Sequence, residues 1–222
     1  MKELSVFDII GPNMIGPSSS HTAGALRIAL LAGKMVKHTV TAVEFVLYGS
    51  FARTYQGHGT DRALVGGILG FSPEDYRIRD SFQIAGERGL KFSFRPDTQT
   101  RDVHPNTVDV ILTEETGTVT TVRGESIGGG AAVIKQINGV DIKLNGELST
   151  ILIRQKDTPG VLAHIALCFA RNHINIAFTR MYREAKGEMA YTIIEADGAI
   201  PKEVLLDIEQ SSSVVSAILI EL

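Results

Sequence analysis

The sequence predicts an α+β fold in two domains, and three observations support this prediction. Before Leu144, segments with the apolar spacing of helices are mixed with segments that alternate like strands, without strict order. From Thr150 onward, the predicted order of elements contains the strand–helix–strand unit twice. Between the two regions, Asn145-Gly146-Glu147-Leu148-Ser149 is polar and prone to turns, so we expect a first domain at residues 1–144 and a second at 150–222.

Apolar spacing and turn residues define the elements of the first domain. Helices are predicted at 22–36, at 61–70 and from residue 73, and strands at 41–48, 91–95, 107–112, 119–124 and 131–144, the last broken at 138–139. The third helix is predicted to begin at Pro73 because proline suits the first helical position, where Glu74 and Asp75 would complement the helix dipole. The turn Glu115-Thr116-Gly117 predicts a hairpin between the strands on either side of it.

The second domain follows the order of a ferredoxin-like fold. Its strands are predicted at 150–155, 174–183, 188–196 and 214–220, and its helices at 160–172 and 201–209. Such a sheet leaves an edge and one helix face available, so we expect that it can form a homodimer. Pro159 precedes the first helix and Gly160 leaves the first N–H groups of that helix uncovered, which suits the carboxylate of an amino acid.

Composition excludes several classes of function. The chain has 222 residues, of which 44% are hydrophobic and 21% charged, as in a globular protein. The net charge of -3 and the lack of a basic cluster give no reason to expect nucleic-acid binding. No uninterrupted apolar run is long enough to span a membrane, and Met1-Lys2-Glu3 does not begin a signal peptide, so we expect a cytoplasmic chain without a membrane partner.

Cys168 is the only cysteine in the sequence. An intrachain disulfide is therefore impossible. An iron–sulfur cluster needs several thiolates, commonly about four, so this chain cannot hold one by itself. Cys168 shares helical spacing with Leu162, Ile165 and Phe169, which favours a role in packing over a reactive thiol.

The stretch from Gly11 to Gly24 is the most informative part of the chain. Two Gly-Pro pairs interrupt any regular strand or helix, and a run of good helix formers follows. Between them lies a dense group of small polar residues: Ser18, Ser19, Ser20, His21 and Thr22. Free N–H groups at a helix start favour an anion, and a histidine can exchange a proton near neutral pH. We expect a site for a small molecule that carries a carboxylate; the alternative is a serine-rich helix cap without a ligand.

A second histidine lies between two glycines, in Tyr55-Gln56-Gly57-His58-Gly59-Thr60-Asp61-Arg62. The glycines let the backbone approach whatever the imidazole contacts, and Thr60 or Asp61 is expected to cap the next helix. A mobile turn is the alternative interpretation.

Two further segments carry weaker signals. Ser126-Ile127-Gly128-Gly129-Gly130 suggests a backbone that lies against a ligand or another chain, although a flexible loop between strands would look the same. His104 could line a site, but a turn built on Pro105 and Asn106 explains the segment without a function.

Together these segments resemble a known family. The N-terminal Ser5-Val6-Phe7-Asp8-Ile9-Ile10-Gly11-Pro12, the serine–histidine loop at 16–24 and the loop at 57–61 are similar to the beta subunit of bacterial iron–sulfur L-serine dehydratase. Residues from about 150 onward resemble an ACT domain, a regulatory module that binds amino acids. The resemblance covers essentially the whole chain, and the serine–histidine loop is its specific part.

This resemblance implies an activity and a partner. The family converts L-serine to pyruvate and ammonia, with a 4Fe–4S cluster held by the cysteines of a separate alpha subunit. An iron of that cluster would act as the Lewis acid that removes the β-hydroxyl group. The beta subunit lends loops to the cleft between the two chains, so this chain would need a cysteine-containing alpha subunit and would bind no metal itself.

The resemblance also implies roles for individual residues. His58 and His21 are the catalytic candidates, one of which would transfer a proton, and the residues do not decide which. The expected substrate-binding residues are Ser18, Ser19, Ser20, Thr22, Gly59, Thr60 and Asp61, with the serines and Thr60 holding the carboxylate and ammonium groups. In the ACT domain, the expected effector contacts are Asp157, Gly160 and Asn175; the alternative is a domain that only dimerises.

A different class of function stays open. A similar N-terminal fold resembles the allosteric domain of some phosphoglycerate dehydrogenases, so the chain could be a stand-alone module that senses an amino acid. Two loops that both carry titratable groups favour the enzyme subunit, because sensing alone would not require them.

Overall fold

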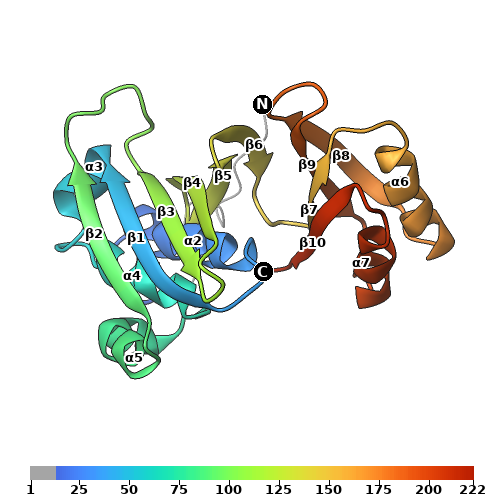
Figure 1. Cartoon of the computed structure of the whole chain (residues 1–222). Coiled ribbons are helices and arrows are strands. Elements are labelled where there is room, and N and C mark those ends of the chain that lie inside the picture. Colours follow the sequence, from blue (N-terminus) through green and yellow to red (C-terminus); the bar gives the residue numbers. More distant parts are fainter. Residues whose placement is uncertain (1–13) are drawn as a thin grey trace, which may run out of the picture. The chain divides into compact units, whose positions relative to one another are not determined.

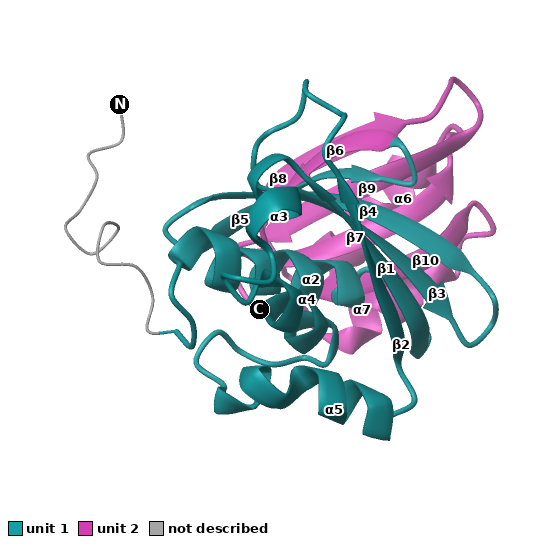
Figure 2. Cartoon of the chain, turned by 90° about the vertical axis from the view of Figure 1, so that its left-hand side faces the viewer, with its two compact units in different colours: residues 1–139 teal, residues 140–222 magenta. Residues whose placement is uncertain are grey.

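The computed structural model describes residues 14–222, and its contacts divide the chain between Gly139 and Val140 into two compact units (Figures 1 and 2). The motif expected at 5–12 and the N-terminus at 1–3 lie outside the described residues. The mixed α+β class expected from the sequence is confirmed, with two separate sheets. No helix within residues 14–222 is long and apolar enough to cross a membrane.

The first sheet has six strands in the order β2-β1-β3-β4-β5-β6. In chain order they are β1 (Val40–Tyr48), β2 (Lys91–Asp97), β3 (Thr107–Glu114), β4 (Val119–Gly128), β5 (Ala131–Ile137) and β6 (Val140–Leu144). Strands β1 and β2 are parallel, whereas the pairs β1/β3, β3/β4 and β4/β5 are antiparallel. The predicted hairpin is present, with Gly117 at a φ of 82° in its turn.

Two helices of the first unit pack together against one face of this sheet (Figure 2). They are α2 (Ala25–Lys34) and α4 (Thr60–Ile68), and both bury alanines, leucines and other apolar residues. A Cβ at Gly67 of α4 would overlap the backbone carbonyl of Leu26, and one at Gly124 of β4 would overlap Ile28. Glycines therefore let α2 lie unusually close to both its neighbours.

The start of the first helix differs from the prediction. The residues before α2 form a π-helical turn, η1 (Ser19–Gly24), instead of α-helix. After β1, the short helix α3 (Gly49–Thr54) was not predicted, because six residues are too few to show an apolar stripe.

The helix predicted from Pro73 is wrong. The Pro73 carbonyl accepts the Ile15 N–H at 2.9 Å, and Asp75 caps a 3₁₀ turn, η2 (Tyr76–Asp80), by accepting the Arg77 N–H at 2.9 Å. The α-helix, α5 (Ser81–Glu87), begins only after that turn. Asp75 therefore works as a cap and not as a first-turn charge.

The second unit has the predicted ferredoxin-like order. After β6, its elements are β7 (Ser149–Lys156), α6 (Val161–Arg171), β8 (Ile176–Arg183), β9 (Met189–Ala196), α7 (Lys202–Glu209) and β10 (Val214–Ile220). The sheet order is β10-β7-β9-β8, with antiparallel neighbours. Both helices pack on one face, around a core that includes Ile151, Ile165, Phe169 and Ile194.

The close approach of α2 and α4 can be tested with a pair of glycine substitutions. Gly67→Ala should lower the free energy of unfolding by about 1–3 kcal/mol, because the new methyl group overlaps backbone atoms of α2. Gly33→Ala in α2 is the matched control: its Cβ would meet Ile68 only at 3.9 Å, so better helix propensity should raise stability by about 0.5–1 kcal/mol. Chemical denaturation measures the free energy of unfolding of both variants. Equal effects of the two substitutions would contradict the close packing of α2 against α4.

Candidate functional site

The π-helical turn η1 fixes the position of His21. Ser18 precedes the turn in an extended conformation, and its side-chain oxygen accepts the backbone N–H of His21 at 3.2 Å. The Ser18 carbonyl accepts the Thr22 N–H at 2.8 Å. The expectation that the serines cap a helix is thus confirmed for Ser18. Single π-helical turns occur frequently at functional sites.

Two hydroxyl groups contact the imidazole of His21. Ser50, on the first turn of α3, lies with its Oγ 2.9 Å from Nε2. The Oγ of Ser18 lies 3.4 Å from Nδ1. The ring also meets Phe51 edge to face, with 5.3 Å between ring centroids. Both nitrogens and one edge of His21 are therefore occupied by neighbouring side chains.

The His58 loop lies against the same turn. The centroids of the His21 and His58 rings are 4.9 Å apart, and the Thr22 hydroxyl donates to the His58 carbonyl at 3.2 Å. Gly59 has a φ of 69° and is itself the N-cap of α4. The expected cap by Thr60 or Asp61 is therefore wrong: a left-handed backbone starts the helix without a side-chain bond.

Burial and charge act on the titratable groups of this cluster. Burial, and then the positive charge of His58, hold the pKa of His21 below its usual value. His21 is therefore neutral near neutral pH. Burial also raises the pKa of Asp61, whose carboxylate accepts the Arg62 N–H at 2.8 Å.

Three buried polar atoms of the first unit lack a hydrogen-bond partner within the described part of the chain: Thr60 Oγ1, Asn106 Oδ1 and Ser126 Oγ. Thr60 and Ser126 are fully buried. Ser126 donates its backbone N–H to the Asn106 carbonyl at 3.0 Å, and its hydroxyl lies where a Cβ of Gly24 in η1 would be. Buried groups of this kind normally have partners, so they are candidates to meet a ligand.

The structure brings four of the predicted residues into contact, and three further polar residues, Ser50, Asn106 and Ser126, lie near them. Ser18, His21, Thr22 and His58 are in contact, while Ser19 and Ser20 are half-buried in η1 and their hydroxyls bond no residue among 14–222. Ser50, Asn106 and Ser126 were not among the predicted site residues. Nothing in the spacing indicates Ser50 or Asn106, whereas the Gly-rich loop after Ser126 was a visible signal.

The Gly-rich segment after Ser126 forms the turn between β4 and β5. Gly128, Gly129 and Gly130 all have positive φ, at 100°, 59° and 80°. His104 is explained by its turn, because its Nδ1 accepts the Asn106 N–H at 3.2 Å.

In the second unit, Asp157 and Gly160 line a cavity of about 430 Å³ at the start of α6. Gly160, with a φ of 88°, is the N-cap and provides no side-chain bond. The Asp157 carboxylate is already engaged, accepting the Gly187 N–H at 3.1 Å and pairing with Arg183 at 3.5 Å. Asn175 does not line this cavity and instead donates to Asp197. The three expected effector contacts are therefore not brought together.

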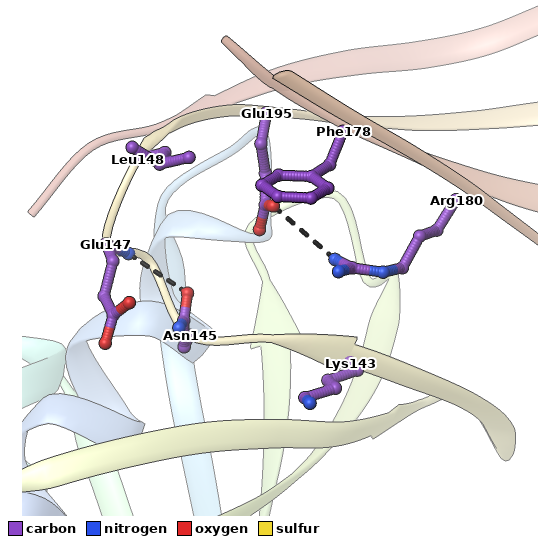
Figure 3. A pocket seen from close by; sticks show the side chains of 7 residues that line it. All are labelled: Lys143, Asn145, Glu147, Leu148, Phe178, Arg180 and Glu195. Carbon is purple, nitrogen blue, oxygen red and sulfur yellow. Dashed lines mark hydrogen bonds and ion pairs between the residues drawn. The ribbon is translucent and has the colours of Figure 1, made fainter. Parts of the chain in front are cut away.

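A second, smaller cavity of about 180 Å³ lies beside β8 and β9 (Figure 3). Phe178 and Glu195 are cross-strand partners there, and Arg180 pairs with Glu195 at 3.5 Å. Arg180 and Glu195 are therefore already engaged with each other.

The described residues do not fit an iron–sulfur cluster. Residues 14–222 contain no group of three or more His, Cys, Asp or Glu side chains placed to hold a metal. Cys168 is buried in α6, and burial raises the pKa of its thiol. His164 is also used in packing, since its Nε2 lies 3.0 Å from the Asp207 carbonyl at the end of α7.

Comparisons with known proteins match both domains of the chain. The serine dehydratase beta chain family matches residues 5–138, and the AHAS small subunit-like ACT domain matches residues 151–216. The L-serine dehydratase beta chain of Peptoniphilus asaccharolyticus is 41% identical over 95% of this chain and 96% of its own length. The probable L-serine dehydratase beta chain of Bacillus subtilis is 40% identical over 97% of each chain.

A longer relative matches over part of its length. The L-serine dehydratase of Streptomyces coelicolor is 29% identical over 62% of this chain and 35% of its own. The resemblance expected from the loops at 16–24 and 57–61 is confirmed, and the chain belongs to the serine dehydratase beta chain family.

Proposed function

We propose that this chain is the beta subunit of an L-serine dehydratase, which converts L-serine to pyruvate and ammonia together with an alpha subunit. The observation that carries the proposal is the pair of imidazoles, 4.9 Å apart, held by two loops rich in hydroxyl groups and glycine. The names of the two relatives that match nearly the whole chain support the same substrate. A sensing module would not need this titratable pair.

His58 is the better candidate for proton transfer. The ring nitrogens of His58 form no hydrogen bond within residues 14–222, so they are available to a substrate, whereas both nitrogens of His21 face serine hydroxyls. A general base must reach the proton that it removes and must have a free lone pair. His58 would take the α-proton of L-serine, and neutral His21 would orient it and tolerate the charge that develops.

The substrate-binding residues fall into two groups. Ser19, Ser20 and the buried Thr60 have hydroxyl groups without partners among the described residues, so they would hold the carboxylate and ammonium groups. Ser18, Thr22, Gly59 and Asp61 would shape the two loops, because their polar atoms or backbone already serve η1 and α4. Hydrogen bonds from positioned donors can align the substrate before the proton moves.

The alpha subunit would hold the 4Fe–4S cluster, because the described residues of this chain offer no ligand set for it.

We also propose that the ACT domain binds an amino acid at the cavity by Gly160, where Lys186 lines the opening. A homodimer could use the apolar side chains exposed on α6, Leu162 and Leu167.

The proposed activity is tested by reconstitution. The purified chain should release no pyruvate from L-serine, because its described residues provide no cluster site. Anaerobic co-expression with a cysteine-rich alpha chain should give brown protein that produces pyruvate, measured by a coupled assay. Substantial dehydratase activity of this chain alone, or an inactive brown complex, would contradict the proposal.

The two histidines are expected to matter for turnover and little for folding. In the reconstituted complex, His58→Ala should lower kcat by about 100-fold or more, the usual size of a lost general base, and His21→Ala should lower it less. His38→Ala is the control, because His38 is exposed and its ring lies outside the cluster. If both site variants keep normal rates while their melting temperatures fall, the loops are structural.

Effector binding is tested in the ACT domain. Gly160→Val should abolish amino-acid binding measured by calorimetry, because a side chain would cover the first N–H groups of α6. Since Gly160 has a φ of 88°, this variant can also strain the backbone, so Lys186→Glu provides a second test through charge. Lys202→Glu on α7 is the control, and saturated turnover should stay normal in all three. A native complex that binds no amino acid would make the domain a dimerisation element only.

A further inference from the structure

Hydrogen bonds to both backbone groups of Ser50 hold this residue in place at the start of the six-residue helix α3. Its backbone N–H donates to the Pro105 carbonyl at 2.6 Å, and its own carbonyl accepts the Thr54 hydroxyl at 2.9 Å. Gly49 before it has a φ of 52°, and a Cβ there would lie 2.7 Å from the Pro105 oxygen. The chain therefore turns sharply after β1, and this turn places the Ser50 hydroxyl beside η1.

The Ser50 hydroxyl has one described partner, the Nε2 atom of His21 at 2.9 Å. On the other side of the ring, the Ser18 oxygen already accepts the His21 backbone N–H and lies 3.4 Å from Nδ1. A neutral imidazole has a single lone-pair nitrogen, which is its strong acceptor. If Nε2 is that acceptor, it accepts the Ser50 hydroxyl in the shorter of the two contacts. The N–H at Nδ1 then points to a free lone pair of the Ser18 oxygen.

We propose that Ser50 is a positioning residue for the histidine pair: its hydroxyl donates to Nε2 of His21 and fixes His21 as the Nδ1–H tautomer. With the Nε2 lone pair occupied, protonating His21 would require the Ser50 hydroxyl to turn away. The proton taken from a substrate would then reside on His58. The catalytic meaning of this arrangement rests on the proposed function, whereas the tautomer itself does not.

Other charges near η1 do not account for the arrangement. The elements packed against the turn carry seven charged residues: Arg27 and Lys34 on α2, Asp61 and Arg62 on α4, Arg123 and Glu125 on β4, and Lys135 on β5. Glu125 and Lys135 pair with each other at 3.9 Å, and Arg123 pairs with Asp109 at 2.6 Å. The pKa of His21 is lowered by burial first and by the charge of His58 second. A hydrogen bond to the neutral form works in the same direction, since it favours the unprotonated ring.

The test uses the full chain labelled with ¹⁵N-histidine, without the alpha subunit. Imidazole NMR spectra followed with pH should show His21 as the Nδ1–H tautomer, with a pKa lowered from the usual value for histidine. Ser50→Ala should raise that pKa by about 0.5–1 unit and mix the two tautomers, as expected from the loss of one hydrogen bond. Ser50→Thr, which keeps the hydroxyl, should restore the wild-type spectrum.

The control is Ser216→Ala in β10, which should leave the His21 signals unchanged. A purely structural Ser50 would alter the melting temperature of the Ala variant without changing the tautomer, and that result would overturn the inference. An Nε2–H tautomer in the wild type would overturn it as well. If the Thr variant does not fold, the Ala variant still decides, because alanine suits the first turn of a helix.

Kinetics of the reconstituted complex separate this inference from the proposed function. Ser50→Ala should lower kcat by roughly tenfold with little change in KM, the effect of one hydrogen bond on a catalytic group. If the NMR spectra change as expected while no complex is active, Ser50 positions His21 and the proposed function fails. If the complex is active and neither the spectra nor kcat respond to Ser50→Ala, the inference fails alone.

Discussion

The close approach of α2 to its neighbours is the constraint on which the rest of the first unit depends. Gly67 lets α4 lie against the backbone of α2, and Gly124 lets β4 lie against Ile28 on another side. At the start of the same helical stretch, Gly24 leaves room for the Ser126 hydroxyl. Because α2 is closely packed on several sides, the π-helical turn that precedes it has little freedom to move, and the position of His21 is fixed with it.

Hydroxyl groups rather than charges organise the histidine pair. Ser18 and Ser50 contact the two nitrogens of one ring, and Thr22 bonds the backbone that carries the other. Carboxylates in these positions would stabilise a positive imidazolium and raise its pKa. Hydroxyls add no such charge, so burial, and then the charge of His58, keep the pKa of His21 below its usual value.

Sequence patterns predicted the strands and the two histidine-bearing loops. They did not predict which residues from distant segments lie beside those loops. β10 was predicted at its observed bounds, and the break at Asn138-Gly139 separates β5 from β6 as expected. Pro73 misled the prediction, because a capping carboxylate two residues later competes with the helix. Ser50 and Asn106 could not be predicted as site residues: Ser50 lies 29 positions from His21, and contacts between distant segments leave no trace in the spacing of one sequence. Asn175 was grouped with Asp157 by resemblance, whereas the fold gives it a different partner.

The buried thiol of α6 has a practical meaning for handling the protein. Cys168 is only 1% exposed, its raised pKa leaves little thiolate at neutral pH, and the sequence contains no other cysteine. Oxidants attack the thiolate of accessible cysteines, so the thiol of Cys168 should react very slowly with oxygen. Preparations of this subunit should therefore tolerate aerobic work without reducing agents. Any sensitivity to oxygen in an assembled enzyme would then be a property of its other components.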